Sequence, residues 1–451
     1  MSKIFGTDGI RCLVNEEPLS AETCLKISKT VAFLLKKKNS VNSRVVICKD
    51  TRLSGYLYEP LVTAGFISMG MDVILVGPLP TPAVPLMIKT LRADLGVMIT
   101  ASHNTYEYNG LKFFNNQGVK LSSAIEKKVE KIISNNKEYS KIINKTYKSG
   151  KAKRLEDASG RYSEFLKSTL SKKEKTSTLK IILDCANGAT YNIAPSLFWE
   201  LGHKVISIND KPDGININQK CGAVNTKELS KHVLKNKADI GFAFDGDGDR
   251  IIVIDEKGNE VDGDKIIALF SKYFVSKNKK FNKKDIIITT MSNMGLEIYL
   301  KEKLKLGVRR TEVGDINVIN KMKSVNALLG GEQSGHIIFS EYSNTGDGIL
   351  AALKIMEILI SSKIKTSKLF NLYKDYNQKK INLKYVTKSK ILTKSMDAIN
   401  KSKLFNNNKI RSLVRFSGTE PLIRILVEGK DKEIVKKNFI KINNMIRKYL
   451  D

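Results

Sequence analysis

Strand-like and helix-like segments alternate along most of this chain, and this alternation limits the folds open to it more than any other feature. The first unit begins with the apolar segment 45–47, continues through a helical pattern over 57–69 and returns to an apolar segment at 73–76. Similar units start at 180–184 and at 285–290. Because alternation of this kind is typical of α/β domains, the sequence predicts three similar α/β units with mixed or parallel sheets.

Changes in this pattern divide the chain into four predicted domains. A chain of 451 residues is long enough for several domains of ordinary size. The lysine-rich stretch 125–153 carries a basic helix and a polar connector, and the last part of the chain changes to strands followed by a helix, an α+β pattern. We therefore predict three α/β domains and a C-terminal α+β domain, with the bounds 1–153, 154–255, 256–366 and 367–451.

The strong positive charge of the chain does not by itself indicate a nucleic-acid partner. The formal net charge is +31, but the lysines are spread over predicted helices and loops, without an aromatic-rich platform or a basic reading helix. The sequence has no apolar signal segment and no run of about 20 apolar residues, and its five cysteines form no CxxC pair. We therefore expect a soluble, cytoplasmic protein without nucleic acid, membrane, disulfide framework or zinc.

The loop 100–104 presents a serine directly after the apolar segment 95–99. Such a loop is a common place for a nucleophile on an α/β scaffold, although a serine beside a histidine is more often a turn residue. A second polar cluster, far along the chain, strengthens the functional interpretation. A hydroxyl that can carry phosphate, here Ser102, and a carboxylate site for a cation are the two halves of a phosphoryl-transfer centre.

That second cluster consists of Asp245, Asp247 and Asp249, which alternate with glycines and are called the aspartate triplet below. Carboxylates at alternate positions of a tight loop can meet on one divalent cation. An EF-hand is excluded because Arg250 occupies the position that needs glycine and the flanking segments are strand-like. An acidic turn is the alternative, but three aspartates this close repel one another unless a cation or an arginine lies beside them. We expect Mg²⁺, which favours a few carboxylates plus a phosphate oxygen.

Three other glycine-containing loops carry candidate ligands. The segment 415–424 has an arginine at each end, and its hydroxyls, guanidinium groups and backbone N–H groups favour a phosphate site, with a surface turn as the alternative. The segment 330–336 presents a carboxylate, an amide, a hydroxyl and an imidazole, which suit a polyhydroxylated or amino-bearing ligand. The segment 5–11 places Arg11 at its end, and Lys112 follows the serine loop closely enough to reach the same centre.

Together these motifs resemble those of the α-D-phosphohexomutase family. Five motifs occur in the family's order along essentially the whole chain: FGTDGIR, TASHN, DGDGDR, GEQSGH and RFSGTEPLIR. The resemblance implies four domains around a central cleft, each lending one loop. The FGTDGIR opening and Gln333 are typical of the branch that acts on glucosamine phosphates, and phosphogluco- or phosphomannomutases of the same family are the alternative.

The resemblance also implies a role for each motif residue. Ser102 matches the family's phosphoserine, and its phosphate would join the aspartate triplet as a further ligand of Mg²⁺. The sugar-binding loop is matched by Glu332 and Ser334. The loop that holds the non-reacting phosphate of the substrate is matched by Arg415, Ser417, Gly418, Thr419 and Arg424. Positions that assist proton and charge handling are matched by Arg11, Lys112, Arg250 and His336.

The activity implied is the interconversion of glucosamine 6-phosphate and glucosamine 1-phosphate, which feeds UDP-N-acetylglucosamine and cell-wall precursor synthesis. Phospho-Ser102 would pass its phosphoryl group to the sugar, and the bisphosphorylated intermediate would reorient and return its other phosphoryl group. Lys112 or His336 would serve as general base or acid, whereas His103 has no such role because a phosphoserine needs no base to act as donor.

The resemblance further implies one Mg²⁺ per subunit and either glucosamine 1,6-bisphosphate or glucose 1,6-bisphosphate as the activating donor. We expect small phosphosugars as partners and a monomer or homodimer. Three positions depart from the family pattern: Cys12 replaces a glycine, Phe416 replaces a proline, and residues 316–317 replace Arg-Tyr. The first two are expected to alter loop geometry and rate, and the third puts a substrate contact in question.

Overall fold

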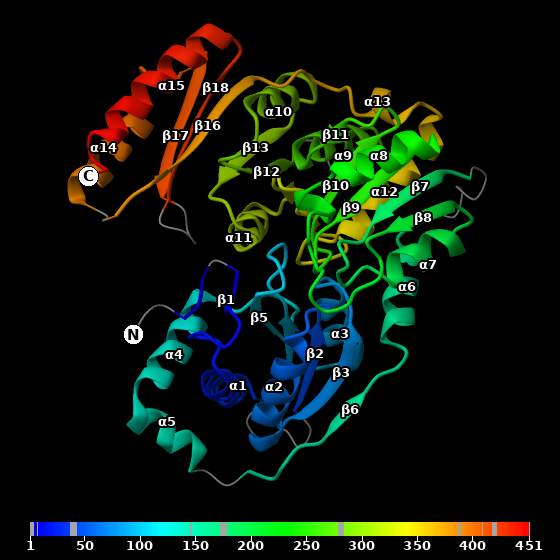
Figure 1. Cartoon of the computed structure of the whole chain (residues 1–451), viewed down its shortest axis with the longest axis vertical. Coiled ribbons are helices and arrows are strands. Elements are labelled where there is room, and N and C mark those ends of the chain that lie inside the picture. The colour runs from blue at the N-terminus through cyan, green and yellow to red at the C-terminus, as the bar shows by residue number, and fades with distance from the viewer. Residues whose placement is uncertain are drawn as a thin grey trace.

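The four-part organisation predicted from the sequence is present in the structure, a computed structural model (Figure 1). It describes residues 4–6, 8–36, 43–144, 147–171, 178–277, 284–386, 389–407, 409–416 and 422–450. These residues form four β-sheets, each drawn from one continuous part of the chain. The first three sheets are mixed and belong to α/β units, and the fourth is antiparallel, so the predicted fold class is confirmed.

The first unit contains a six-stranded sheet with the order β1-β5-β4-β2-β3-β6. Its strands are β1 (Ile10–Leu13), β2 (Arg44–Lys49), β3 (Asp72–Pro78), β4 (Leu95–Ile99), β5 (Tyr108–Asn115) and β6 (Ala152–Arg154). Its helices are α1 (Ala21–Leu35), α2 (Gly55–Ser68), α3 (Ala83–Leu91), α4 (Ser123–Ser134) and α5 (Asn136–Ile143). Strand β5 is antiparallel to β4, whereas β4, β2, β3 and β6 are parallel. The serine loop therefore leaves the sheet at the carboxyl ends of the parallel strands, where ligands bind in open α/β sheets.

The second unit contains a five-stranded sheet with the order β11-β10-β9-β7-β8. Its strands are β7 (Lys180–Asp184), β8 (Lys204–Ile208), β9 (Ile240–Phe244), β10 (Ile251–Asp255) and β11 (Glu260–Val261). Its helices are α6 (Ala158–Ser168), α7 (Ile193–Glu200), α8 (Lys227–Asn236) and the short 3₁₀ turn η1 (Gly222–Val224). Every residue of β9 and β10 is buried, which explains their continuous apolar sequences. These two strands form an antiparallel hairpin whose loop carries the aspartate triplet.

The third unit has the strand order β13-β12-β14-β15. Its strands are β12 (Asp285–Thr289), β13 (Gly307–Thr311), β14 (Leu329–Gly331) and β15 (Ile337–Phe339). Its helices are α9 (Gly263–Lys277), α10 (Met294–Ile298), the π-helical turn η3 (Tyr299–Lys303), α11 (Asp315–Val325), α12 (Gly348–Ser362) and α13 (Thr366–Leu369). Helix α12 is buried along most of its length and packs against β9, β10 and α6, so the third unit is built onto the second.

The C-terminal unit is an antiparallel sheet with the order β16-β18-β17. Its elements are β16 (Asn377–Lys384), α14 (Lys390–Lys401), β17 (Ile410–Phe416), β18 (Leu422–Gly429) and α15 (Lys432–Arg447). Both helices cover the same face of the sheet (Figure 1). This is the α+β arrangement that the sequence predicts for the last part of the chain.

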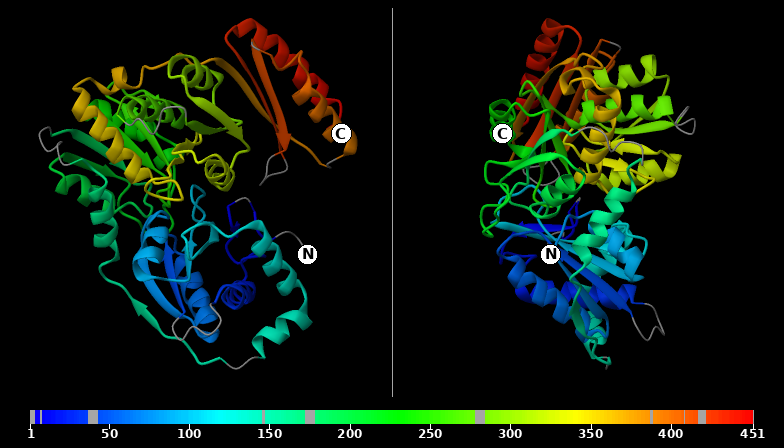
Figure 2. Two further views of the ribbon diagram at one scale, coloured as in Figure 1. Left: turned by 180° about the vertical axis from the view of Figure 1, so that it is seen from behind. Right: turned by 90° about the vertical axis from the view of Figure 1, so that its right-hand side faces the viewer.

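The C-terminal unit has a hydrophobic core of its own, whereas the other three units share one. One buried cluster runs without a break from Val46 in the first unit, through the second, to Phe370 at the end of the third. The C-terminal unit has a core of its own, between Leu383 and Ile446. The left view of Figure 2 shows this unit beside the third, to which Arg411 connects it by hydrogen bonds to the backbone carbonyls of Thr290 and Ser292. Among the described helices, none has the length and apolar character needed to cross a membrane. The exact domain bounds stay predictions.

Candidate active site

The serine loop and the aspartate triplet, which are far apart in the sequence, meet in the structure. The Oγ of Ser102 donates a hydrogen bond of 2.7 Å to Oδ2 of Asp245. Ser102 is 1% exposed, and its φ of 52° lies in the left-handed region that a serine rarely adopts. Its backbone N–H donates to Oγ1 of Thr100 at 2.8 Å. A buried, conformationally constrained hydroxyl thus faces the carboxylates directly.

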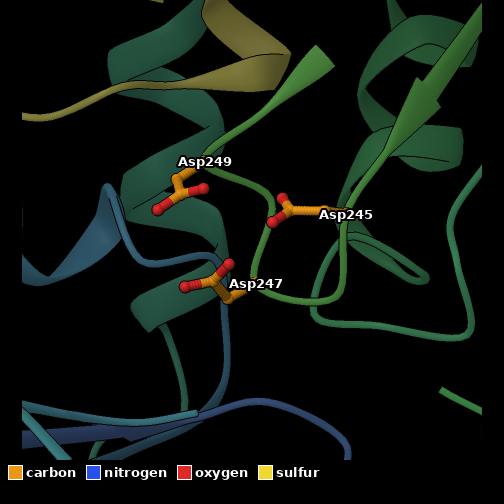
Figure 3. Close-up of side chains that lie close together, drawn as sticks. All are labelled: Asp245, Asp247 and Asp249. Carbon is orange, nitrogen blue, oxygen red and sulfur yellow. The ribbon is translucent and has the colours of Figure 1, made fainter. Parts of the chain in front are cut away.

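The aspartate triplet forms a compact site for a cation (Figure 3). One carboxylate oxygen from each residue lies within 4.8 Å of the others, and all three residues are buried. Among the described residues, Oδ1 of Asp247 and Oδ1 of Asp249 have no hydrogen-bond partner. Buried carboxylate oxygens without partners are costly unless something positive binds them, so this donor set fits a hard divalent cation such as Mg²⁺.

The surroundings shift the pKa values of Asp245 and Asp247 in opposite directions. Burial, with Asp249 and Asp247 nearby, raises the pKa of Asp245 well above its usual value. Burial opposes ionisation of Asp247 too, but Lys112 and a 2.6 Å hydrogen bond from Thr81 outweigh it and lower the pKa of Asp247. Asp245 is therefore the carboxylate of this pair that most needs a positive neighbour.

Arg250 supplies part of that positive charge. Its Nε lies 4.0 Å from Oδ2 of Asp245 and 3.9 Å from Oδ1 of Asp249. Burial opposes the charged form, but Asp245, Asp249 and Glu332 outweigh it and raise the pKa of Arg250. Arg250 is therefore a permanent cation at the edge of the triplet, on the side of Glu332.

Lys112, predicted to reach the serine centre, lies within it on β5. Its Nζ is 2.8 Å from Oδ2 of Asp247, 3.1 Å from Oδ2 of Asp8 and 3.4 Å from Oδ2 of Asp249. Burial disfavours its charged form, but the three carboxylates outweigh this and raise the pKa of Lys112 well above its usual value. In this arrangement Lys112 holds its proton, which suits charge stabilisation or proton donation better than proton abstraction.

Asp8 is a residue that the sequence did not single out, although it lies within the FGTDGIR motif. Its carboxylate binds Arg11 at 2.9 Å, and also Lys112 and Lys120. These cations outweigh the effect of burial and hold the pKa of Asp8 well below its usual value. Lys120 in turn binds Asp315, so Asp8 and Lys120 connect the serine centre to the third unit. The sequence signal that could have identified Asp8 is its position between Gly6 and Gly9 in the motif.

The two histidines near the centre differ in what they contact. Nδ1 of His103 lies 3.4 Å from Oγ of Ser102, and burial together with Arg250 and Arg11 lowers the pKa of His103 to about 3. His336 is buried, and its Nε2 accepts a 2.8 Å hydrogen bond from the backbone N–H of Gly346. That ring nitrogen is occupied by the protein's own backbone. The choice between Lys112 and His336 as general base or acid stays open.

The predicted sugar-binding loop is the turn between β14 and β15. Oε1 of Glu332 accepts a 2.8 Å hydrogen bond from the backbone N–H of Gly314, and Oγ of Ser334 lies 3.5 Å from Oε2 of Glu332. Gln333 points elsewhere, since its amide contacts Asp262 at 3.0 Å and Lys380 at 3.2 Å. The structure thus brings Glu332 and Ser334 together.

The predicted phosphate loop lies between β17 and β18. Arg415 and Arg424 are directly opposite each other in the register of these strands, whereas Ser417, Gly418 and Thr419 lie outside the described residues. Burial and the neighbouring charge of Arg424 lower the pKa of Arg415, against the attraction of Glu312 and Glu332. Two guanidinium groups on adjacent strands repel each other and favour an anion between them.

Fold and site together define a phosphohexomutase, and the comparisons agree. Residues 2–140, 160–258 and 262–376 match "Phosphoglucomutase/phosphomannomutase, alpha/beta/alpha domain" I, II and III, and residues 381–441 match the C-terminal domain of the same family. The chain therefore belongs to the phosphoglucomutase/phosphomannomutase family, and within it to the phosphoglucosamine mutases. It is 46% identical to the phosphoglucosamine mutase of Granulibacter bethesdensis, over 96% of this chain and 94% of that one. It is 45% identical to that of Thermodesulfovibrio yellowstonii, over 96% of each chain.

Solved structures share the whole fold. A phosphoglucomutase/phosphomannomutase family protein from Burkholderia thailandensis superposes with a TM-score of 0.85 at 23% identity, covering 100% of this chain and 99% of its own. An N-acetylphosphoglucosamine mutase from Aspergillus fumigatus, in complex with GlcNAc-6P and magnesium, has a TM-score of 0.69 at 18% identity, covering 99% and 96%. At these identities the likeness shows the arrangement of the four units alone.

Proposed function

We propose that this chain, a mutase-type isomerase, interconverts glucosamine 6-phosphate and glucosamine 1-phosphate through a phosphoserine at Ser102. The observation that carries the proposal is the 2.7 Å contact between Oγ of Ser102 and Asp245, beside two buried carboxylate oxygens that accept no hydrogen bond from the described residues. A phosphoserine carries about −1.5 to −2 charges, so it needs compensating positive charge at this place. The aspartate triplet and the Ser102 phosphate would hold Mg²⁺, which when bound neutralises charge on the transferred phosphoryl group.

The reaction balances as two phosphoryl transfers in opposite directions. In the first, the bond between phosphorus and Oγ of Ser102 breaks, a bond forms to a hydroxyl oxygen of the sugar phosphate, and the hydroxyl proton leaves to a base. The sugar bisphosphate then reorients. The bond between its other phosphorus atom and the sugar oxygen breaks, a bond from that phosphorus to Oγ of Ser102 forms, and the freed sugar oxygen takes the proton back from the protonated base. Because such transfers depend mainly on position and charge, Arg250 and Arg11 would stabilise the negative charge on the phosphoryl oxygens.

The remaining loops would hold the part of the substrate that does not react. Glu332 and Ser334 would bind sugar hydroxyls, and Arg415 and Arg424 would grip the non-reacting phosphate with planar, two-pronged contacts. Reorientation requires that the phosphate site accept two orientations of the sugar. We propose that the C-terminal unit, which has its own core, moves relative to the other three to allow this.

The direct test is intact-protein and peptide mass spectrometry of the purified chain, which should find one phosphate, on Ser102. Activity should require Mg²⁺, and chains that lack phosphate on Ser102 should also need a catalytic amount of glucosamine 1,6-bisphosphate or glucose 1,6-bisphosphate, because the serine must be phosphorylated before the first turnover. Full activity of a chain that carries no phosphate on Ser102 would contradict the proposal.

The substrate is tested by comparing kcat/KM for glucosamine 6-phosphate with the values for glucose and mannose phosphates. Glucosamine 6-phosphate should be preferred. A preference for a neutral hexose would assign the chain to a phosphogluco- or phosphomannomutase activity instead. We also propose that the protein is cytoplasmic and works as a monomer or homodimer, which fractionation and sedimentation would test.

A further inference from the structure

Arg52, just after β2, is directed entirely at the loop that carries Ser102. The residue is 1% exposed, and its Nε binds Oδ2 of Asp50 at 2.9 Å. Its two terminal nitrogens donate to four backbone carbonyl oxygens between the serine and the start of β5: Ser102 at 3.0 Å, Asn104 at 2.8 Å, Tyr108 at 3.0 Å, and Thr105. All five N–H groups of the guanidinium are thus used, four of them on the segment 102–108.

Asn218 grips the same loop from the second unit. Its Nδ2 donates to the carbonyl oxygen of Ser102 and to that of Asn104, each at 2.8 Å. Asn218 is 4% exposed and has a φ of 56°, and its backbone N–H is anchored on the carbonyl of Ala186. The carbonyl of Ser102 therefore accepts hydrogen bonds from two sides, one from each unit that forms the centre.

These contacts surround a backbone conformation that a serine does not hold by itself. Ser102 has a φ of 52°, and such conformations persist only where the surroundings impose them, most often at functional sites. The N–H of Ser102 is fixed as well, because Oγ1 of Thr100 accepts from it and donates to Oδ2 of Asp50 at 2.6 Å. Both backbone polar groups of Ser102 are thus tied to the network that Arg52 and Asp50 form.

We propose that Arg52 and Asn218 are positioning residues for phosphoryl transfer, and we call the pair the carbonyl clamp. By holding the carbonyl of Ser102, the clamp keeps this residue left-handed and aims its Oγ at Asp245. Neither residue contacts a reacting atom. The inference rests on the proposed function, because its consequence is the placement of the phosphoserine. In-line transfer is sensitive to misplacement by a fraction of a bond length, so loosening the clamp should lower kcat and leave substrate binding intact.

Asn218→Ala tests the clamp, with Asn209→Ala as the matched control. Asn209 belongs to the same unit and is also left-handed, with a φ of 50°, but its side chain binds Asp184 and not the serine loop. Both variants lose the same amide and the same backbone preference. We expect Asn218→Ala to lower kcat by about 10- to 100-fold relative to the control, with KM changed less than about threefold.

Hydrogen exchange gives a second readout that does not depend on turnover. Amides of the segment 100–108 should exchange about tenfold faster or more in Asn218→Ala than in Asn209→Ala. Equal exchange and equal kcat in the two variants would overturn the clamp. A wild-type chain without mutase activity or phosphate on Ser102 would instead refute the proposed function, while the exchange data would still report on the clamp.

Arg52→Lys probes the other half of the clamp without removing the positive charge beside Asp50. A lysine has three donors on one atom and cannot reach the four carbonyls that the planar guanidinium spans. If this variant folds, kcat should fall as in Asn218→Ala, and Asn218→Ala in the same chain should add little further loss. Additive losses in the double variant would mean that the two residues act independently and would overturn a shared clamp.

Discussion

The serine centre and the strand ends that carry Arg415 and Arg424 are built in different ways, and in the proposed reaction they would handle the two ends of the same substrate. Around Ser102 the carboxylates, Lys112 and the clamp are buried, and charges and hydrogen bonds from two units hold them in place. Arg415 instead stands at a strand end, in a unit whose core is separate from the others. In the proposed reaction, bond making would need a rigid site, whereas turning the intermediate over would need a site that can move.

The largest effect expected is at the rigid site. Ser102→Ala removes the hydroxyl that would carry the phosphate, so turnover of glucosamine 1-phosphate should fall by on the order of 10³-fold or more, because the covalent intermediate can no longer form. A coupled assay measures the loss. Thermal unfolding is the control, since the variant should keep the cooperative transition of the wild type. Activity within tenfold of wild type would mean that Ser102 does not carry the phosphate.

Asp247→Asn should produce the next largest effect, through the metal. One ligand charge is lost, so the Mg²⁺ dissociation constant should rise about 100-fold. Since Mg²⁺ binds only the folded chain, it should raise the unfolding temperature of the wild type by a few degrees and that of the variant hardly at all. Asp239→Asn, an exposed carboxylate of the same unit, is the control. An unchanged Mg²⁺ response in Asp247→Asn would mean that the triplet is not the metal site.

Arg415→Lys tests the proposed phosphate site of the C-terminal unit. Replacing a two-pronged contact with a point charge should cost about 1.5–3 kcal/mol of phosphate binding, which corresponds to a KM roughly 10- to 100-fold higher with kcat nearly unchanged. Phosphate on Ser102 should stay at the wild-type level. Arg447→Lys on α15 is the matched control. A loss confined to kcat would mean that the phosphate loop takes part in the chemistry.

The smallest effect expected is a change in how stability depends on pH, and it concerns Asp264 in the third unit, near the junction of that unit with the C-terminal unit. Burial and the neighbouring Asp262 raise the pKa of its carboxyl to about 7, with Arg310 acting in the opposite direction and Tyr373 close by. Because this value exceeds the usual 3.8, the folded state holds the proton more tightly than the unfolded state. The resulting stabilisation is complete below about pH 4 and is lost as the pH rises through about 7.

Asp264→Asn keeps an acceptor for the N–H of Asn293 and cannot titrate. Between pH 5 and 8 the unfolding temperature of the wild type should therefore fall by a few degrees more than that of the variant. Asp397→Asn, at an exposed position of α14, should retain the wild-type slope. Identical slopes in all three proteins would show that this carboxyl does not make the junction sensitive to pH.

Much of the site was predictable because its residues stand in loops punctuated by glycine after apolar strands. The aspartate triplet is one such case, since its alternation with glycine implies converging carboxylates in any tight turn. Arg52 stands in such a segment, between an apolar strand and Gly55, and is one of the few arginines within the motifs, but neither its contacts nor the role of Asn218 could be found in this way. Arg52 follows β2 and Asn218 lies between β8 and α8, and their shared target is a backbone carbonyl that leaves no mark in the sequence.

The sequence by itself determined the four units, the chemical groups available and the family to which they belong, because strand and helix periodicity and residue type are local properties. Only the tertiary structure decided how those groups act on one another. The proton held by Lys112, the opposed acidities of Asp245 and Asp247, and the left-handed backbone of Ser102 each depend on groups more than 100 residues away. Charge and hydrogen bonding act through space, and folding alone brings these partners within a few ångströms.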